Sequence, residues 1–208
     1  MDTPARALTQ AQAFPASDRS VRHPRTERGL DLYETPPAAV EALLQVERLP
    51  HCLFEPFAGR SAIVRVLRDH GHAVIASDIH DYGGLHFVGD FLKQTKAPVG
   101  TEAIVTNPAF GSAVPFVAHA IELAPLVVLL LRWDFYEGHR PRRIQILERS
   151  GLARIHLFRR RLEDMHRSGW TGPKARPRQA LAWFVWERGY TGSTVVVDRV
   201  SWEDQPSA

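Results

Sequence analysis

Apolar segments of strand length alternate with helix-like segments along most of the chain. The longest, residues 126–131, is apolar throughout, which is typical of a central strand buried on both faces of a parallel sheet. In residues 61–70, by contrast, Ile63, Val64 and Leu67 share one face of a helix. This alternation predicts an α/β fold, a Rossmann-like, doubly wound, mostly parallel seven-stranded sheet with helices on both faces.

The element boundaries follow from the same patterns and from the turn residues between them. The predicted helices are residues 36–46, 61–70, 114–123 and 140–149. The predicted strands are residues 53–56, 73–77, 86–88, 103–106, 126–131, 154–158, 180–186 and 194–197. Trp183 and Trp186 fall within a strand pattern, so we expect both in the core.

Length and composition indicate one domain without a membrane span. The 208 residues suffice for one α/β domain, residues 29–208, preceded by a flexible arm at 1–28 and carrying a basic loop insertion around 159–178. The sequence has no apolar signal core near its start and no run of about 18 apolar residues, so we expect a cytoplasmic protein. Cys52 is the sole cysteine and no Cys or His cluster has metal-ligand spacing, so we expect no metal site.

Polar side chains stand where four predicted strands end. Glu55 and Asp78 close the first two strands, Asp90 follows the third, and Asn107 follows the fourth. Ligands of an open parallel sheet bind at the carboxyl ends of the strands, near the point where the strand order reverses. Four such residues in sequence order therefore predict a ligand site at this edge.

In this order the residues resemble class I S-adenosylmethionine-dependent methyltransferases, and specifically N6-adenine DNA methyltransferases, over residues 31–135. The resemblance implies S-adenosylmethionine as the cofactor. The implied cofactor residues are Tyr33, Thr35 and Pro36, which meet the methionine carboxylate; Glu55, Phe57 and Gly59, which cradle the methionine part; Asp78, which holds the ribose hydroxyls, with Ile79 beside it; Asp90 and Phe91, which contact the adenine ring; and Asn107. For Phe57 a place in the core is an equally good expectation.

The family's catalytic motif is Asp/Asn/Ser-Pro-Pro-Tyr/Phe, and the chain has Asn107-Pro108-Ala109-Phe110 in its place. The Asn107 amide oxygen and the Pro108 carbonyl are acceptors for the N–H bonds of an amine conjugated to an aromatic ring. Accepting those bonds directs the nitrogen lone pair at the methyl group, so catalysis is mainly positioning. Phe110 supplies a face for the target base, a stacking contact worth about 1–3 kcal/mol.

Two positions depart from the family pattern. Ala109 replaces a proline, which makes the loop less rigid. The glycine-rich turn is Gly59-Arg60-Ser61 rather than Gly-x-Gly, and Ser61 is a candidate N-cap of the following helix. These departures keep open a non-catalytic nucleic-acid-binding module built on a decayed methyltransferase fold.

Basic residues are concentrated in residues 132–178, which hold 13 Lys and Arg against 5 Asp and Glu. Cations bind phosphates, and an aromatic side chain among them stacks on a base or wedges into a duplex. We therefore predict nucleic acid as the partner, and the resemblance to N6-adenine DNA methyltransferases places DNA ahead of RNA. The predicted nucleic-acid-binding residues are Trp133, Arg159, Arg160, Arg161, His166, Arg167, Trp170, Lys174 and Arg176. Trp133 is equally well expected in the core.

The expected activity is transfer of a methyl group to N6 of adenine in DNA, with catalytic residues Asn107, Pro108 and Phe110. Enzymes that methylate adenine in RNA, or a glutamine amide in a protein, carry the same type of loop. The basic region argues against a protein acceptor but does not separate DNA from RNA.

Overall fold

The computed structural model describes residues 34–109, 113–137, 141–148, 150–162 and 179–203. Several of the predictions fall on other parts of the chain. Those that lie outside the described residues are the N-terminal arm, Tyr33, Phe110, and the basic-loop positions His166, Arg167, Trp170, Lys174 and Arg176.

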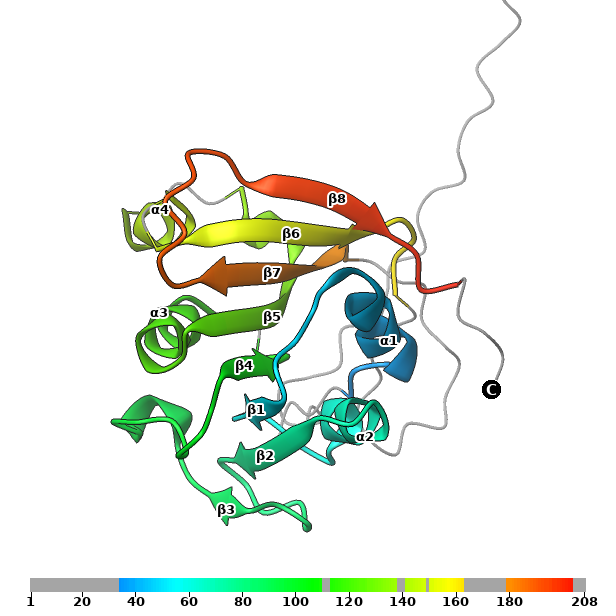
Figure 1. Ribbon diagram of the computed structural model, residues 1–208, viewed down its shortest axis with the longest axis vertical. Coiled ribbons are helices and arrows are strands. Elements are labelled where there is room, and N and C mark those ends of the chain that lie inside the picture. The colour runs from blue at the N-terminus through cyan, green and yellow to red at the C-terminus, as the bar shows by residue number, and fades with distance from the viewer. Residues whose placement is uncertain (1–33, 110–112, 138–140, 149, 163–178, 204–208) are drawn as a thin grey trace, which may run out of the picture. The chain divides into compact units, whose positions relative to one another are not determined.

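The described chain alternates strands with helices, as predicted (Figure 1). The α-helices are α1 (Pro37–Val46), α2 (Ala62–Asp69), α3 (Ala113–Leu123) and α4 (Pro141–Glu148). The strands are β1 (Cys52–Glu55), β2 (Ala73–Asp78), β3 (Phe87–Val88), β4 (Ala103–Thr106), β5 (Leu126–Arg132), β6 (Leu152–Phe158), β7 (Leu181–Glu187) and β8 (Val196–Val200). Two short 3-10 helices, η2 (Phe91–Lys93) and η4 (Trp133–Phe135), follow β3 and β5 and were not expected from the sequence.

All the described strands belong to one sheet in the order β3-β2-β1-β4-β5-β7-β6-β8. β7 runs antiparallel to β5 and β6, and the other described neighbours pair in parallel. The order moves outward from β1 in one direction and from β4 in the other, so the point of reversal lies between β1 and β4. This confirms the doubly wound, mostly parallel architecture.

The expected seven-stranded sheet is one strand short: each of the eight predicted strand segments is a strand, and all eight belong to the sheet. β8 pairs in parallel with β6 at the edge of the sheet, and it begins two residues later than the predicted segment 194–197. Val196 and Val197 are 57% and 45% exposed. An edge strand without a buried face lacks the alternation of apolar and polar residues from which strand limits are predicted.

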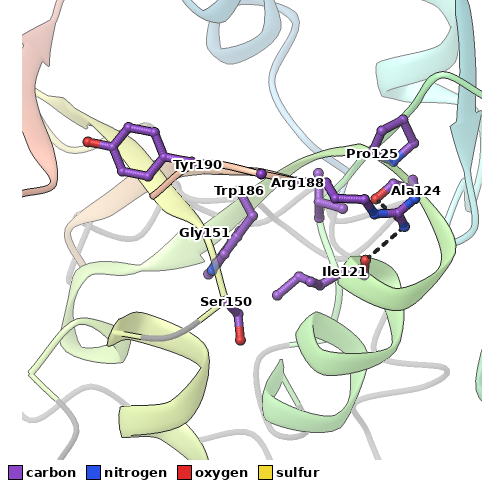
Figure 2. A pocket seen from close by; sticks show the side chains of 10 residues that line it. Ile121, Ala124, Pro125, Ser150, Gly151, Trp186, Arg188 and Tyr190 are labelled. Atoms are coloured by element: carbon purple, nitrogen blue, oxygen red, sulfur yellow. Dashed lines mark hydrogen bonds between the residues drawn. The ribbon is translucent and has the colours of Figure 1, made fainter. Parts of the chain in front are cut away.

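A cavity of about 180 Å³ lies at the amino ends of β5 and β6 (Figure 2). Arg188 lines it, and its guanidinium group donates hydrogen bonds to the carbonyl oxygens of Ile121, Glu122 and Ala124 at 3.3, 3.0 and 3.2 Å. Arg188 therefore caps the carboxyl end of α3, where unpaired carbonyls favour a cation. The cavity lies at the opposite edge of the sheet from Glu55, Asp78 and Asn107.

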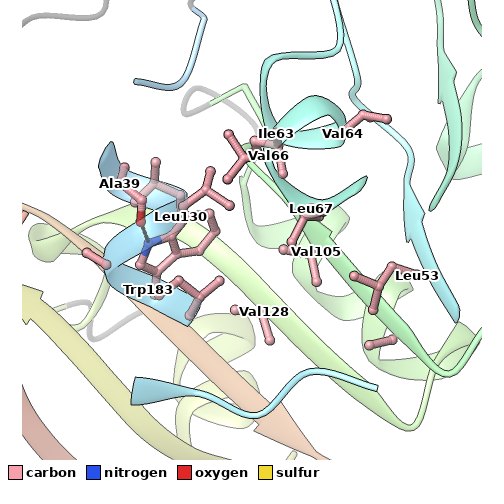
Figure 3. Close-up of a cluster of buried hydrophobic side chains, with 14 of the residues drawn as sticks. Ala39, Leu53, Ile63, Val64, Val66, Leu67, Val105, Val128, Leu130 and Trp183 are labelled. Carbon is pink, nitrogen blue, oxygen red and sulfur yellow. Dashed lines mark hydrogen bonds between the residues drawn. The ribbon is translucent and has the colours of Figure 1, made fainter. Parts of the chain in front are cut away.

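Hydrophobic clusters cover both faces of the sheet because successive residues of each buried strand point to opposite faces. In β5, Val128 and Leu130 belong to the cluster with α1 and α2, and Val127 and Leu129 to the cluster with α3 and α4. Trp183 of β7 is fully buried in the first cluster, and its indole N–H donates to the Ala39 carbonyl oxygen at 2.9 Å (Figure 3). Trp183 and Trp186 are both core residues, as predicted.

No helix in the described part of the chain is long and apolar enough to cross a membrane.

Candidate functional site

Four polar residues stand in a row along the carboxyl edge of the sheet. Glu55 and Asp78 are the last residues of β1 and β2, Asp90 comes two residues after β3, and Asn107 comes one residue after β4. The strand order β3-β2-β1-β4 makes these four strand ends consecutive neighbours. The fold therefore brings together residues that span 52 positions of the sequence.

The Asp78 carboxylate holds the turn that follows β1. Its Oδ2 accepts a hydrogen bond from the main-chain N–H of Gly59 at 2.9 Å, and its Oδ1 accepts one from the N–H of His80 at 3.1 Å. Asp78 is 7% exposed, so these hydrogen bonds lie mostly out of competition with water. Asp78 thus fixes the position of the glycine turn relative to the end of β2.

The turn between β1 and α2 uses the left-handed backbone region twice. Gly59 has φ of 50° and Ser61 has φ of 65°. Ser61 occupies the N-cap position of α2, as predicted, but its side chain makes no capping hydrogen bond. A second glycine suits this position better because a β-carbon is strained at positive φ, so the Gly-x-Gly pattern has a conformational basis that Ser61 only partly satisfies.

Glu55 is a buried acid, 1% exposed, beside Asp78. It accepts a hydrogen bond from the main-chain N–H of Val64 in the first turn of α2. Its Oε2 is buried without a hydrogen-bond partner among the described residues. Burial and the neighbouring Asp78 charge raise the pKa of Glu55 well above its usual value. The site therefore places two acids close together, and the described part of the chain supplies no donor to one carboxylate oxygen.

Asp90 and Phe91 connect the third strand to the same region. Asp90 caps η2 by accepting a hydrogen bond from the Leu92 N–H at 3.0 Å. Phe91 is 2% exposed, and its ring lies edge-on to Phe57 with centroids 5.4 Å apart. Phe57 is half-buried and also contacts Phe116 of α3 at 4.6 Å. Both expectations for Phe57 thus remain compatible, since one edge packs on the core while the side chain keeps part of its surface exposed.

Ile79, the residue after Asp78, is 56% exposed. An apolar side chain that is open to solvent directly beside the Asp78 carboxylate is available to contact an apolar ring surface. Its exposure distinguishes it from Phe91, which the core already covers.

Asn107 and Thr35 meet although 72 positions separate them in sequence. The Nδ2 of Asn107 donates a hydrogen bond to Oγ1 of Thr35 at 3.0 Å. Thr35 is buried, Asn107 is half-buried, and Pro108 is buried beside it. Pro36 stands at the N-cap position of α1. The segment that precedes α1 therefore lies against the loop that follows β4.

The described nucleic-acid candidates follow β5 and β6 at the same edge of the sheet. Trp133 opens η4, is half-buried, and lies 5.4 Å from the Tyr136 ring, measured between centroids. Arg159, Arg160 and Arg161 come directly after β6 and are exposed. Arg160 forms an ion pair with Glu203. The carboxyl edge thus combines the four polar residues with exposed cations.

A buried polar network around His156 was missed by the sequence reasoning. His156 of β6 is 3% exposed, and its ring nitrogens contact Glu47 at 2.9 Å and Asp198 at 2.7 Å. Arg154 also binds Glu47, at 3.0–3.1 Å. Glu47 and His156 are 109 positions apart, so no local pattern predicts their pairing. The network joins the end of α1 to β6 and β8.

In the described residues, no group of three or more His, Cys, Asp or Glu side chains is arranged to hold a metal ion.

No protein-family model matches the sequence, and no curated protein matches it in sequence. Solved structures do match the fold. A protein assigned as an RNA methyltransferase from Pyrococcus horikoshii matches with a TM-score of 0.56 at 15% identity, over 80% of this chain and 90% of that one. A modification subunit assigned to a type I restriction enzyme from Vibrio vulnificus matches with a TM-score of 0.55 at 12% identity, over 85% of this chain and 48% of that one.

A protein from Listeria monocytogenes assigned as a class I S-adenosylmethionine-dependent methyltransferase matches with a TM-score of 0.50 at 9% identity, over 80% of this chain and 65% of that one. The chain spans about half the length of the Vibrio subunit and most of the Pyrococcus protein. At these identities the matches show that the chain has the Rossmann-like fold of these proteins.

Proposed function

We propose that this chain is an S-adenosylmethionine-dependent methyltransferase that acts on N6 of adenine in DNA. The observation that carries the proposal is the row of Asp78, Glu55 and Asn107 at the carboxyl ends of β2, β1 and β4. Ligands of doubly wound sheets bind at this edge, beside the point where the strand order reverses. Each position in the row has the chemistry that the reaction needs there.

The two acids fit a cationic cofactor. Glu55 has a buried carboxylate oxygen without a partner among the described residues, and Asp78 lies near enough to raise its pKa. A buried acid of this kind is stabilised by a positively charged or hydrogen-bond-donating group. S-adenosylmethionine supplies an electrophilic methyl group on a positively charged sulfur, together with an ammonium group. Glu55 and Gly59 would face its methionine part, and Asp78 and Ile79 its nucleoside part.

Asn107 and Pro108 would then orient the acceptor. An exocyclic amine on an aromatic ring is a poor nucleophile because its lone pair is delocalised into the ring. The Asn107 side-chain oxygen and the Pro108 carbonyl accept its two N–H bonds and turn the lone pair out of the ring plane. Phe110, which lies outside the described residues, would stack on the base. A base within a duplex has to be flipped out to reach this loop.

The cations after β6 support a nucleic-acid acceptor. Arg159, Arg160 and Arg161 are exposed at the edge of the sheet that carries Asn107. Arginines there would bind backbone phosphates and hold the strand over the loop. Trp133 would contribute a partly exposed ring beside the base.

Transfer of a tritiated methyl group from S-adenosylmethionine to DNA, RNA and protein acceptors tests the proposal. We expect label in DNA, recovered as N6-methyladenine by mass spectrometry of the nucleosides. Asn107→Ala is the control, and it should abolish transfer while it changes cofactor affinity by no more than a few-fold. Label in RNA alone would overturn the DNA assignment, and normal turnover by the variant would overturn the mechanism.

A further inference from the structure

Arg132 ends β5 and lies on the same face of the sheet as Asn107. In the parallel register of β4 and β5, Asn107 stands level with Leu130, because the residues before them are paired. Leu130 packs in the cluster with α1 and α2, and Arg132, two residues further along β5, points to the same face. Arg132 therefore lies diagonally beyond Asn107, about 8 Å away between Cα atoms by the ordinary spacings of a parallel sheet.

The guanidinium group of Arg132 is only partly satisfied by the described residues. Its Nη2 donates to the carboxylate of Asp134, whereas its Nε is buried and finds no hydrogen-bond partner among them. An arginine carries five N–H groups in a planar fork, which matches a phosphate through two parallel hydrogen bonds. A phosphate that accepts from both Nε and Nη2 would thus satisfy this side chain better than Asp134 does.

The Asp134 carboxylate can leave Arg132 without disturbing the turn that carries it. The side chains of Arg132 and Asp134 are 39% and 54% exposed, so water reaches the ion pair, and exposed ion pairs contribute little to stability. The main chain of the turn is held separately. The Trp133 N–H donates to the Ala180 carbonyl oxygen at 2.8 Å. The Nη1 of Arg143 donates to the Asp134 carbonyl oxygen at 3.3 Å.

We propose that Arg132 binds a backbone phosphate of the acceptor strand beside the target base, and that this phosphate takes the place of Asp134. A base whose exocyclic amine reaches Asn107 has its sugar and phosphates farther out from the sheet, where Arg132 lies. The exposed arginines after β6 continue the path, because only β7 separates β6 from β5. This inference rests on the nucleic-acid acceptor of the proposed function, to which it adds a phosphate contact next to the reacting base.

The salt dependence of binding to a fluorescently labelled oligonucleotide tests the phosphate contact. Arg132→Gln should weaken binding at least 5-fold and lower the slope of log K against log salt concentration by about 1, because one phosphate fewer is neutralised. Arg132→Lys keeps the charge without the fork, so it should keep the slope and lose part of the affinity. Arg48→Gln is the matched control, because Arg48 is exposed between α1 and the start of β1, at the opposite edge of the sheet, and both affinity and slope should stay unchanged.

An unchanged slope in Arg132→Gln would overturn the proposal. The dissociation constant for S-adenosylmethionine should stay within 3-fold of wild type in this variant. Cofactor binding that is at least 10-fold weaker, with normal oligonucleotide binding, would assign Arg132 to the cofactor carboxylate and would also overturn it.

The replacement of Asp134 by phosphate is tested with a double-mutant cycle. Asp134→Asn removes the carboxylate that competes for Arg132, so oligonucleotide binding should become at least 3-fold tighter. In the Arg132→Gln background the same substitution should change binding less than 1.5-fold. An equal effect in both backgrounds would show that Asp134 repels the phosphates directly and would overturn the exchange.

Comparison of binding with turnover keeps this inference separate from the proposed function. A reduced slope in Arg132→Gln, in a protein that transfers no methyl group to any acceptor, would retain the phosphate contact and refute the methyltransferase. Methyl transfer to DNA with the same KM and the same salt dependence in Arg132→Gln and wild type would retain the function and overturn the contact.

Discussion

The main-chain nitrogen of Gly59 lies 2.9 Å from Oδ2 of Asp78, and this hydrogen bond ties the turn after β1 to the end of β2. Asp78→Ala should lower the free energy of unfolding by about 2 kcal/mol, because it leaves the N–H groups of Gly59 and His80 without their acceptor. Asp78→Asn keeps one acceptor oxygen, which can serve only one of these two N–H groups, and should cost about half as much. Urea denaturation of the two variants measures the difference, and equal losses would show that the carboxylate does not hold the turn.

Ser61 should be a site where glycine stabilises the protein. Its φ of 65° is strained for a residue with a β-carbon, and its side chain makes no capping hydrogen bond that would be lost. Ser61→Gly should raise the free energy of unfolding by about 0.5–1 kcal/mol. Ser61→Ala is the matched control, because alanine keeps the β-carbon and should give no gain. If chemical denaturation finds the two variants equally stable, strain at position 61 is not the cause.

The His156 network should give the fold a pH-dependent stability. Burial alone would lower the pKa of His156, but its hydrogen bonds with Glu47 and Asp198 outweigh burial and raise it above 6.5. Burial alone would raise the pKa of Glu47, but hydrogen bonds from His156 and Arg154 lower it below 4.5. The stabilisation from His156 is complete below pH 6.5 and is lost as the pH rises through its raised pKa. The stabilisation from Glu47 is complete above pH 4.5 and is lost as the pH falls through its lowered pKa.

The difference in unfolding free energy between wild type and His156→Gln should therefore be largest between pH 4.5 and 6.5, at about 2 kcal/mol, and shrink at higher pH. Denaturation curves from pH 4 to 9 give this difference. The exposed pair of His70 and Glu41, 2.7 Å apart, supplies the control, since His70→Gln should cost at most about 1 kcal/mol. A His156→Gln cost that does not change with pH would contradict the charged network.

Glu55 should destabilise the ligand-free protein at neutral pH. Burial and the Asp78 charge raise its pKa in the folded state, so the folded protein holds this proton more tightly than the unfolded chain does. Its contribution to stability therefore falls as the pH rises from about 4.5 through the raised pKa. Glu55→Gln keeps an acceptor for the Val64 N–H and removes the charge. The free energy of unfolding of this variant, relative to that of wild type, should therefore increase as the pH rises over that range.

If the difference in unfolding free energy between Glu55→Gln and wild type stays constant from pH 4 to 8, the folded state does not raise the pKa of Glu55. If the difference increases as expected, ionised Glu55 destabilises the ligand-free protein, and a bound cation would offset that destabilisation.

The central part of the fold could be predicted because burial on both faces leaves a strong pattern. β5, β7 and the helices α1 and α2 lie within two residues of their predicted limits, since their apolar periodicity reflects the clusters they enter. β8 could not be placed as well, because four of its five residues are exposed. The 3-10 helices η2 and η4 could not be predicted either, because an element of three residues is too short to show a periodic pattern of apolar residues.

The strand-end residues of the site could be predicted for a similar reason. In a parallel sheet each of these site residues lies at the end of its own strand. Predicting the strand therefore also locates the residue, as it does for Glu55, Asp78 and Asn107. The pairing of Asn107 with Thr35 could not be predicted, because it depends on how the segment before α1 crosses the loop after β4. The burial of Phe91 could not be predicted from the sequence either, because it results from the packing of Phe57 and α3 against its ring.

Calorimetric titration of the purified protein with S-adenosylmethionine, compared with Asp78→Asn, which retains one acceptor oxygen for the Gly59 N–H, is the most direct test of the proposed cofactor site. We expect saturable one-site binding by wild type and at least 10-fold weaker binding by the variant, with both proteins folded by circular dichroism. Absence of binding to well-folded wild type would contradict the proposed cofactor site.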